Sequence, residues 1–246
     1  MRRWLCPAEE IEMPWRDVRV VSIKEETPTA KTFRFALNEP VPHLAGQHYV
    51  VRLTAPNGST SERSYSIASP PDGSAEFELT VERLCGGEVS PFLHDVVEPG
   101  DELEVFGPIG GWFVWDAMTP AVLIGGGSGV VPLMAMLRLA RATESADLLR
   151  LLVSVRTPQD LYYSGEIDGL QTTVVHTRAA PPTSPRPPGH LSMMDVSPVL
   201  LPGATAYVCG SAGFTNAAGE LLVEAGVSTD NIRVERFGPS GPGTAH

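Results

Sequence analysis

The apolar pattern of this chain changes near residues 115–119, and this change constrains the fold more than any other feature. Before it, short runs rich in β-branched and aromatic residues alternate with turn clusters. After it, continuous apolar runs alternate with segments of helical character. A chain of 246 residues also exceeds the usual size of one domain. We therefore predict two domains, at 17–115 and 116–238, between an N-terminal extension over 1–16 and a tail over 239–246.

The first domain is predicted to be an antiparallel six-stranded β-barrel. Phe77, Leu79 and Val81 alternate with polar residues, as in a strand with one buried face. Six short strands separated by turns suggest a small closed barrel. One helix is predicted over residues 90–97, with Ser90 as its N-cap. The predicted strands are residues 18–23, 32–37, 47–53, 64–68, 76–84 and 101–106.

The second domain is predicted to be an α/β domain with a parallel sheet. Its apolar runs are continuous, as expected of strands buried on both faces, and they alternate with helical segments. Residues 180–189 hold five prolines and are predicted to form a surface loop. The predicted strands are residues 121–124, 149–155, 173–176, 206–209 and 232–236, and the predicted helices are residues 133–142, 195–200 and 215–225.

Composition excludes several classes of function. The net charge of −11 argues against nucleic acid as a partner, because phosphate binding needs a basic face. No run reaches the ~18 apolar residues of a membrane span, and the N-terminus turns acidic before any signal-peptide core. We therefore expect a soluble, cytoplasmic monomer with no membrane partner. Cys6, Cys85 and Cys209 are too far apart in sequence to suggest a disulfide framework, and the histidines show no metal-ligand spacing.

A glycine-rich loop at residues 125–129 follows a predicted buried strand and opens a helix. Glycines allow close approach to a pyrophosphate, and a helix N-terminus offers amide groups to it. The loop lacks the third glycine of the dinucleotide fingerprint. Val130 stands where a hydrolase nucleophile elbow needs a glycine, so that interpretation fails. A turn that serves only tight packing stays an alternative.

Three other segments carry candidate chemistry. Residues 86–90 also connect a strand to a helix, as either a phosphate cradle or a simple capped turn. Residues 63–66 combine a cation, an aromatic ring and hydroxyls, which suit the pyrophosphate, the ring and the N5 atom of a flavin dinucleotide. Cys209 ends a strand at the carboxyl edge where open parallel sheets bind ligands. Cys209, Glu235 and Phe237 could equally serve packing.

Taken together, these segments resemble the ferredoxin–NADP reductase superfamily from about residue 18 to residue 238. The resemblance rests on six segments that occur in the order of the family: Arg63-Ser64-Tyr65-Ser66, Gly86-Gly87-Glu88-Val89-Ser90, Gly107-Pro108-Ile109-Gly110, Gly126-Gly127-Ser128-Gly129, Cys209-Gly210-Ser211 and Glu235-Arg236-Phe237-Gly238. It implies an antiparallel FAD-binding barrel followed by a pyridine-nucleotide domain, in agreement with the pattern of elements.

The resemblance also implies roles in FAD binding. Arg63 would bind the pyrophosphate, Tyr65 would stack on the isoalloxazine and Ser66, a catalytic candidate, would reach N5. The other expected FAD contacts come from Ser64, from Leu79, Thr80 and Val81 through their backbone, and from Gly86, Gly87, Val89 and Ser90 at the diphosphate.

In the second domain, Gly126, Gly127, Ser128 and Gly129 would accept the nicotinamide dinucleotide. Cys209, followed by Gly210 and Ser211, would flank the nicotinamide at C4, with Glu235 nearby and Phe237 over the far face of the flavin. Cys209, Glu235 and Phe237 are therefore the remaining catalytic candidates.

The implied activity is hydride transfer from NAD(P)H to FAD, followed by transfer of single electrons to a ferredoxin or an oxygenase component. The expected type is an oxygenase reductase without an iron–sulfur domain, because Phe237 is followed only by residues 238–246. A free-flavin or ferric reductase and a non-catalytic electron-transfer subunit remain alternatives. An acidic ferredoxin would be an awkward match for residues 1–115, whose 10 basic and 18 acidic residues give −8.

The preferred nucleotide is expected to depend on Arg156. This residue follows the second strand of the second domain and could pair with a 2′-phosphate, while no acid occupies the position that would hold a free ribose hydroxyl. Asp160 is close enough in sequence to compete for Arg156. We predict NADPH, with NADH as the alternative.

Overall fold

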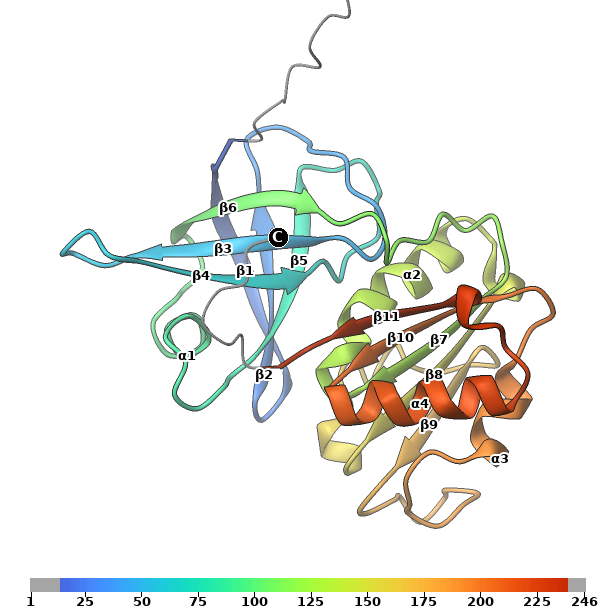
Figure 1. Cartoon of the computed structure of the whole chain (residues 1–246). Coiled ribbons are helices and arrows are strands. Elements are labelled where there is room, and N and C mark those ends of the chain that lie inside the picture. Colours follow the sequence, from blue (N-terminus) through green and yellow to red (C-terminus); the bar gives the residue numbers. More distant parts are fainter. Residues whose placement is uncertain (1–13, 239–246) are drawn as a thin grey trace, which may run out of the picture.

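The computed structural model describes residues 14–238, which form two sheets with helices (Figure 1). The predicted extension, up to residue 13, and the predicted tail over 239–246 lie outside the described residues, as does Cys6. No helix within residues 14–238 is long and apolar enough to cross a membrane.

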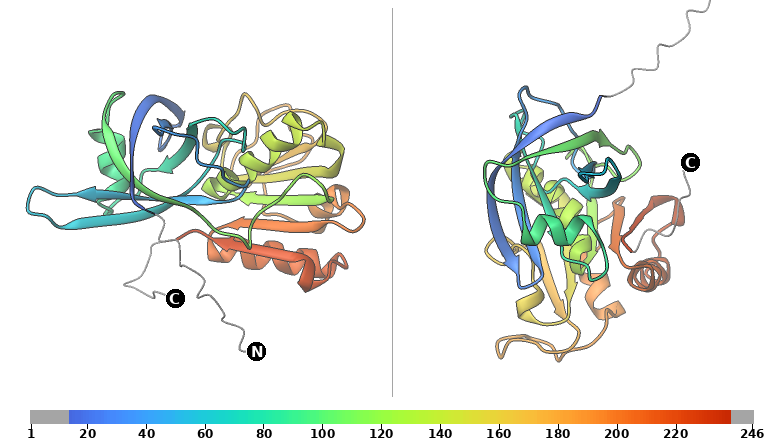
Figure 2. Two further views of the ribbon diagram at one scale, coloured as in Figure 1. Left: turned by 90° about the horizontal axis from the view of Figure 1, so that it is seen from above. Right: turned by 90° about the vertical axis from the view of Figure 1, so that its left-hand side faces the viewer.

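The first sheet has six antiparallel strands in the order β4-β3-β6-β1-β2-β5, which confirms the predicted antiparallel fold. The hairpin of β3 and β4 projects away from the second sheet (Figures 1 and 2). One helix, α1, spans Val89–Asp95. The strands are β1 Arg16–Thr27, β2 Ala30–Ala36, β3 His48–Thr54, β4 Thr60–Ser66, β5 Glu76–Glu82 and β6 Glu102–Ile109.

The predicted closure of this sheet into a barrel was wrong. Within the described residues, edge strands β4 and β5 meet only at an isolated bridge between Ile67 and Leu79, just past the end of β4. Farther along, helix α1 lies beside both β4 and β5. The His94 ring lies 2.9 Å from the Val81 carbonyl oxygen, and the Leu84 amide donates to the Ser90 hydroxyl at 3.1 Å. The sheet therefore stays open beside α1.

The position of α1 also corrects the predicted cap. The helix begins at Val89, so Ser90 lies inside its first turn and its hydroxyl binds the Leu84 backbone instead of capping the helix. A local pattern of serine before proline could not show this partner, because the bond reaches back to the preceding loop.

Aromatic rings fill the core of the first domain. Phe35, Phe77 and Tyr49 stack in a row, with ring centroids 5.4 Å and 4.4 Å apart. All three side chains are almost fully buried, because alternate residues of their strands point inward. This core holds β2, β3 and β5 in one body.

The second sheet has five parallel strands in the order β11-β10-β7-β8-β9, as predicted. Helix α2 packs with Leu123 on one face, and α3 and α4 pack with Val122 and Ile124 on the other. The strands are β7 Ala121–Gly126, β8 Leu149–Val155, β9 Thr172–His176, β10 Thr205–Gly210 and β11 Ile232–Arg236. The helices are α2 Val131–Ala142, α3 Met193–Val196 and α4 Ala212–Glu224, with 3-10 turns η1 Gly127–Val130, η2 Ala146–Leu148, η3 Pro158–Asp160, η4 Ser197–Val199 and η5 Thr229–Asn231.

The strand order reverses at β7, because β8 and β9 extend the sheet on one side while β10 and β11 extend it on the other. Open parallel sheets bind ligands at the carboxyl ends of their strands beside such a reversal of strand order. In Figure 1 this carboxyl edge of the sheet faces the first domain.

The two domains are packed together at the linker that follows β6. The Trp115 amide donates to the Ala45 carbonyl at 3.1 Å. The Arg233 guanidinium of β11 donates to the carbonyl oxygens of Trp112 and Val114, both at 3.0 Å. Gly46 (φ +106°) is pressed so closely against the linker that a Cβ would overlap the Phe113 carbonyl oxygen.

We predict that Gly46→Ala lowers the free energy of unfolding by at least about 3 kcal/mol, since it adds both backbone strain and overlap. Gly58→Ala is the matched control, because Gly58 also has a positive φ (+83°) but no atom within 4 Å of an added Cβ. That control should cost only about 1 kcal/mol. Urea denaturation of the two variants measures the difference, and equal losses would show that the contact at Gly46 can relax.

Candidate active site

A pocket of about 480 Å³ opens at the carboxyl edge of the second sheet and is lined by both domains. Thr27, Glu82 and Leu84 contribute from the first domain. From the second domain, the predicted site residues that line it are Gly126, Gly127, Ser128, Arg156, Ser211 and Phe237. The structure thus brings these six together from four separate segments of the chain.

The glycines of the glycine-rich loop differ in what surrounds them. A Cβ on Gly126 would lie 2.6 Å from the Phe214 ring, and a Cβ on Gly129 would overlap the Cys209 carbonyl group. These two glycines therefore allow tight packing. Gly127 differs, because it has φ +55° and no atom lies within 4 Å of an added Cβ. Its backbone lines the pocket without a side chain, which fits a cradle for a phosphate group.

Cys209 is buried at the end of β10, in register with Gly125 on one side and Glu235 on the other. Burial raises the pKa of its thiol, and the nearby Glu235 carboxylate raises it further. The thiol therefore stays neutral at physiological pH and is a small apolar group rather than a nucleophile. Its side chain belongs to the core beside α2, so packing is an observed part of its role.

Glu235 carries a buried oxygen, Oε2, that has no hydrogen-bond partner among the described residues. Burial raises the pKa of this carboxyl group to about 7. A group with this pKa can hold or release a proton near neutral pH, and an unpaired buried oxygen fits a polar ligand group.

Phe237 closes the same edge of the sheet. Its amide donates to the Gly210 carbonyl at 2.9 Å, and its side chain packs against the core that contains Cys209. Cys209, Glu235 and Phe237 are therefore neighbours, although they come from two strands, because parallel pairing of β10 and β11 sets their register.

On the first domain, the strand β4 presents the predicted flavin-binding residues. Arg63 is exposed, and within the described residues its guanidinium bonds only the Glu62 carbonyl, so most of its donors remain available for an anion. Tyr65 packs partly against the core, and burial raises the pKa of its hydroxyl. Ser64 is exposed and Ser66 is buried at the end of the strand.

The second predicted cradle lies beside the start of β4. Gly86 has φ +80°, and Gly87 has only loose contacts around an added Cβ. The Ser61 hydroxyl of β4 bonds the Glu88 carboxylate, which brings this loop next to the strand that carries Arg63. Val89 is buried. The arrangement fits a diphosphate between Arg63 and this loop.

The side chain of Thr80 already has partners in the structure. Its hydroxyl lies 2.7 Å from that of Thr32 and accepts a hydrogen bond from the Tyr163 hydroxyl at 2.5 Å. The Thr80 side chain is therefore used between the domains. Leu79 and Val81 point into the core of the first domain. This leaves only the backbone of residues 79–81 for a cofactor.

Arg156 lies at the pocket as predicted, but it already has a partner. Its guanidinium bonds the Asp160 carboxylate at 2.9 Å, and this pair is part of an exposed turn. Asp160 also accepts hydrogen bonds from the Thr157 amide and hydroxyl at 3.0 Å and 2.8 Å. Burial opposes ionisation, yet the Thr157 bonds and the Arg156 charge lower the pKa of Asp160. The positive charge at the pocket mouth is thus partly neutralised.

Sequence reasoning missed two aromatic residues that line the pocket, Phe214 and Tyr162. Phe214 lies in the first turn of α4, which begins three residues earlier than predicted, with Ser211 as its N-cap. Tyr162 belongs to a pair of tyrosines in the loop after β8, and two bulky aromatic residues in a loop were a usable signal. Within residues 14–238 no group of three potential ligands is placed to bind a metal ion.

We predict that Glu235→Gln removes a pH dependence of stability. The folded-state pKa is about 7 and the ordinary value 4.5, so the folded protein holds the proton more tightly. The stabilisation by protonated Glu235 is complete below the ordinary pKa and is lost as pH rises through 7. The variant should therefore gain about 2 kcal/mol over the wild type between pH 5 and pH 8.

Urea denaturation at the two pH values measures this difference. Glu220→Gln, at an exposed position of α4, is the control and should show no such gain. If the free energies of unfolding of the wild type and of Glu235→Gln differ by the same amount at both pH values, then folding does not shift the pKa of Glu235.

Comparisons with known proteins agree with this geometry. Residues 17–114 match the family described as "Oxidoreductase FAD-binding domain", and residues 123–220 match "Oxidoreductase NAD-binding domain". Among solved structures, a FAD/NAD-binding domain of a nitric oxide dioxygenase from Vibrio cholerae has a TM-score of 0.79 at 22% identity, covering 91% of this chain and 99% of that chain. A cytochrome P450 reductase of Amycolatopsis has a TM-score of 0.77 at 26% identity, covering 96% and 74%.

Curated relatives extend the comparison. The reductase subunit of glycine betaine monooxygenase from Pseudomonas aeruginosa is 29% identical over 92% of this chain, which spans 65% of that protein. Ferredoxin–NADP reductase B of Sorangium cellulosum is 31% identical, and the match covers 90% of this chain and 97% of the relative. The chain therefore belongs to the ferredoxin–NADP reductase superfamily of FAD- and NAD(P)-binding oxidoreductases.

Proposed function

We propose that this protein is an FAD-containing NAD(P)H reductase that delivers single electrons to an oxygenase component or a ferredoxin. The observation that carries this proposal is the pocket lined at once by the first domain and by the glycine-rich loop of the second. A cofactor bound on β4 and a nucleotide bound on that loop would meet there. Bound FAD would accept a hydride from the reduced nicotinamide and release electrons one at a time.

In this proposal, side chains of the protein bind and orient the flavin and the nicotinamide. Arg63 supplies positive charge to the FAD pyrophosphate, and Tyr65 supplies a ring against the isoalloxazine. Phe237 covers the site and excludes water, which strengthens positioning as the main catalytic effect. Neutral Cys209 leaves room for the nicotinamide, and Glu235 can hold a proton at its unpaired Oε2.

The electron acceptor is proposed from the relatives. Several of them are named as reductase components of oxygenase systems, such as the propane 2-monooxygenase reductase component of Rhodococcus jostii. This chain spans between 42% and 65% of the length of the first such relatives, so their partners transfer only as a proposal. An oxygenase component or a basic acceptor suits the acidic first domain better than an acidic ferredoxin does.

The purified protein should be yellow and should retain FAD through gel filtration. Anaerobic NADPH or NADH should bleach it, and it should then reduce ferricyanide and cytochrome c in turnover. Protein that takes up no FAD would end the proposal. FAD lost on gel filtration would favour a free-flavin or ferric reductase, while bound flavin without turnover would favour a non-catalytic electron-transfer subunit.

Arg63→Ala tests the flavin site directly. Loss of a charge-assisted contact should weaken FAD binding by about 1.5–3 kcal/mol, or about 10- to 150-fold in Kd, as measured by titration of the apoprotein. Arg19→Ala is the control, because Arg19 is an exposed residue of β1 whose ion pair is with Glu102. Unchanged affinity in Arg63→Ala would move the pyrophosphate contact to another residue.

Arg156→Ala tests the choice of nucleotide. If Arg156 exchanges Asp160 for the 2′-phosphate, the variant should lose about tenfold in the ratio of kcat/KM for NADPH to that for NADH. Arg150→Ala is the control at the opposite end of β8, where Arg150 bonds the Leu149 carbonyl. An unchanged ratio would mean that the Arg156–Asp160 pair stays closed and serves the turn alone.

A further inference from the structure

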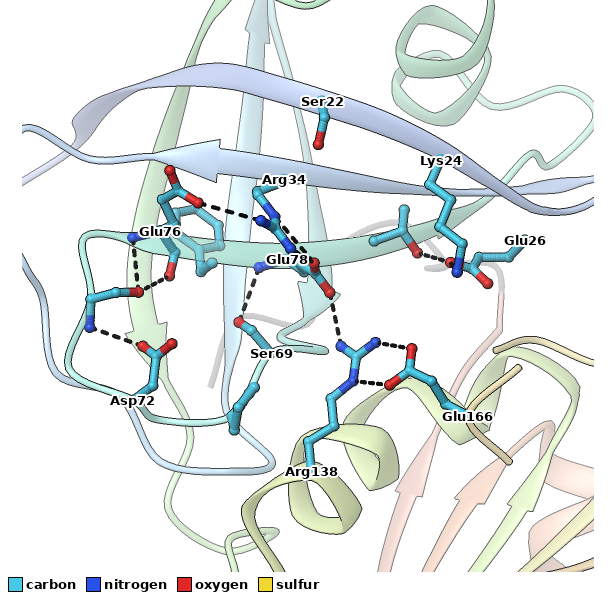
Figure 3. A pocket seen from close by; sticks show the side chains of 14 residues that line it. Ser22, Lys24, Glu26, Arg34, Ser69, Asp72, Glu76, Glu78, Arg138 and Glu166 are labelled. Carbon is cyan, nitrogen blue, oxygen red and sulfur yellow. Dashed lines mark hydrogen bonds and ion pairs between the residues drawn. The ribbon is translucent and has the colours of Figure 1, made fainter. Parts of the chain in front are cut away.

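A second cavity, of about 550 Å³, lies on the other face of β5 from the core of the first domain (Figure 3). Strands β1, β2 and β5 line it from the first domain, and Arg138 and Glu166 line it from the second. Most of its charged side chains pair with one another. Arg34 bonds Glu78 at 2.9 Å, and Lys24 bonds Glu26 at 3.0 Å. Such paired charges fit a contact between domains better than a ligand site.

Arg138 of α2 makes four hydrogen bonds, two of which connect the domains. Within its own domain it donates to both carboxylate oxygens of Glu166, at 2.8 Å and 2.6 Å. Across the boundary it donates to the Glu78 carboxylate at 2.8 Å and to the Ala68 carbonyl at 2.9 Å. Only 16% of its side chain is exposed, so water competes little for these bonds. The planar guanidinium fixes direction as well as distance.

Tyr163 makes a second connection close by. Its side chain is fully buried, and its hydroxyl donates to Thr80 of β5 at 2.5 Å. Its amide donates to the Glu26 carboxylate of β1 at 3.2 Å. Glu26 in turn accepts from Thr32 at 3.0 Å, so the tyrosine meets a connected polar network of the first domain.

Each connection joins elements of the two proposed cofactor sites. Thr80 lies between Leu79 and Val81, on the strand proposed to follow the flavin, and Glu78 lies on the same strand. Arg138 lies on α2, which follows directly from the glycine-rich loop and its 3-10 turn. Tyr163 follows Tyr162, which lines the nucleotide pocket. Displacement of Arg138 or of Tyr163 from its partners in the first domain would therefore change the distance between the two proposed cofactor sites.

We propose that Arg138 and Tyr163 are positioning residues that set the approach of the nicotinamide to the flavin. The inference rests on the proposed function, because it assigns these contacts to hydride transfer between the two bound cofactors. Hydride transfer needs reacting atoms about 3–3.5 Å apart, and a displacement of about 1 Å can cost about 100-fold in rate. Binding of each cofactor to its own domain does not need either residue.

The test uses the full-length, FAD-loaded protein with Arg138→Gln and, separately, Tyr163→Phe. Anaerobic stopped-flow reduction by NADPH should slow about tenfold or more in Arg138→Gln and about threefold in Tyr163→Phe, with the kinetic isotope effect of 4-deuterated NADPH kept or enlarged. Affinities for FAD and for NADP⁺ should stay within about twofold of the wild type, since neither residue belongs to a proposed binding site.

Arg141→Gln is the matched control. Arg141 lies one turn further along α2 and binds the same loop, through the carbonyl oxygens of Glu166 at 2.9 Å and Asp168 at 3.1 Å, but its bonds stay within the second domain. This variant should reduce its FAD at the wild-type rate. In all three variants, photoreduced flavin should pass electrons to ferricyanide as fast as in the wild type.

Two outcomes would overturn the inference. One is wild-type hydride transfer in both Arg138→Gln and Tyr163→Phe. The other is a slowing that Arg141→Gln shares, or that disappears once lower FAD occupancy is corrected for, since either result marks a purely structural role. Failure of the proposed function is distinct, because the wild-type protein itself would then bind no FAD or show no reduction by NADPH.

Discussion

The turn after β7 lies against the end of β10 with no room for a side chain between them, and the pocket depends on this contact. Gly126 and Gly210 both lie directly beneath the Phe214 ring, and Gly129 touches the Cys209 backbone. These glycines bring the two turns together. The turn after β7 and Ser211 after β10 therefore line the same pocket. Tight packing of this loop therefore shapes the pocket beside it.

The buried ionisable groups are of two kinds, those that lack an oppositely charged partner and those that have one. Glu235 and Cys209 are buried without a cation, so the pKa of each is raised and both favour their neutral forms. Arg138 is buried among carboxylates that keep it charged. The groups nearest the proposed hydride path are thus uncharged or able to become so, whereas fixed charges lie between the domains, where they can hold position without disturbing the reacting atoms.

Sequence patterns predicted the elements whose residues carry their own signal. Strands 149–155 and 232–236 were found with the predicted bounds, since a largely apolar run defines the first and apolar residues that alternate with charged ones define the second. Predictions failed where a distant partner decides the outcome. Ser90 binds the Leu84 amide instead of capping α1, and His94 of α1 binds the Val81 carbonyl of β5. None of these partners is visible in the local sequence, because each bond joins segments that only the folded chain brings together.

The loop after β8 contains two tyrosines that the sequence analysis did not identify as site residues. Tyr162 and Tyr163 are adjacent in sequence, yet one lines the nucleotide pocket and the other bonds β5 of the first domain. The left-handed backbone at Tyr163, with φ +53°, reverses the chain so that neighbouring side chains can serve these two places. A single peptide unit therefore joins a side chain of the pocket to a side chain that is bonded to β5.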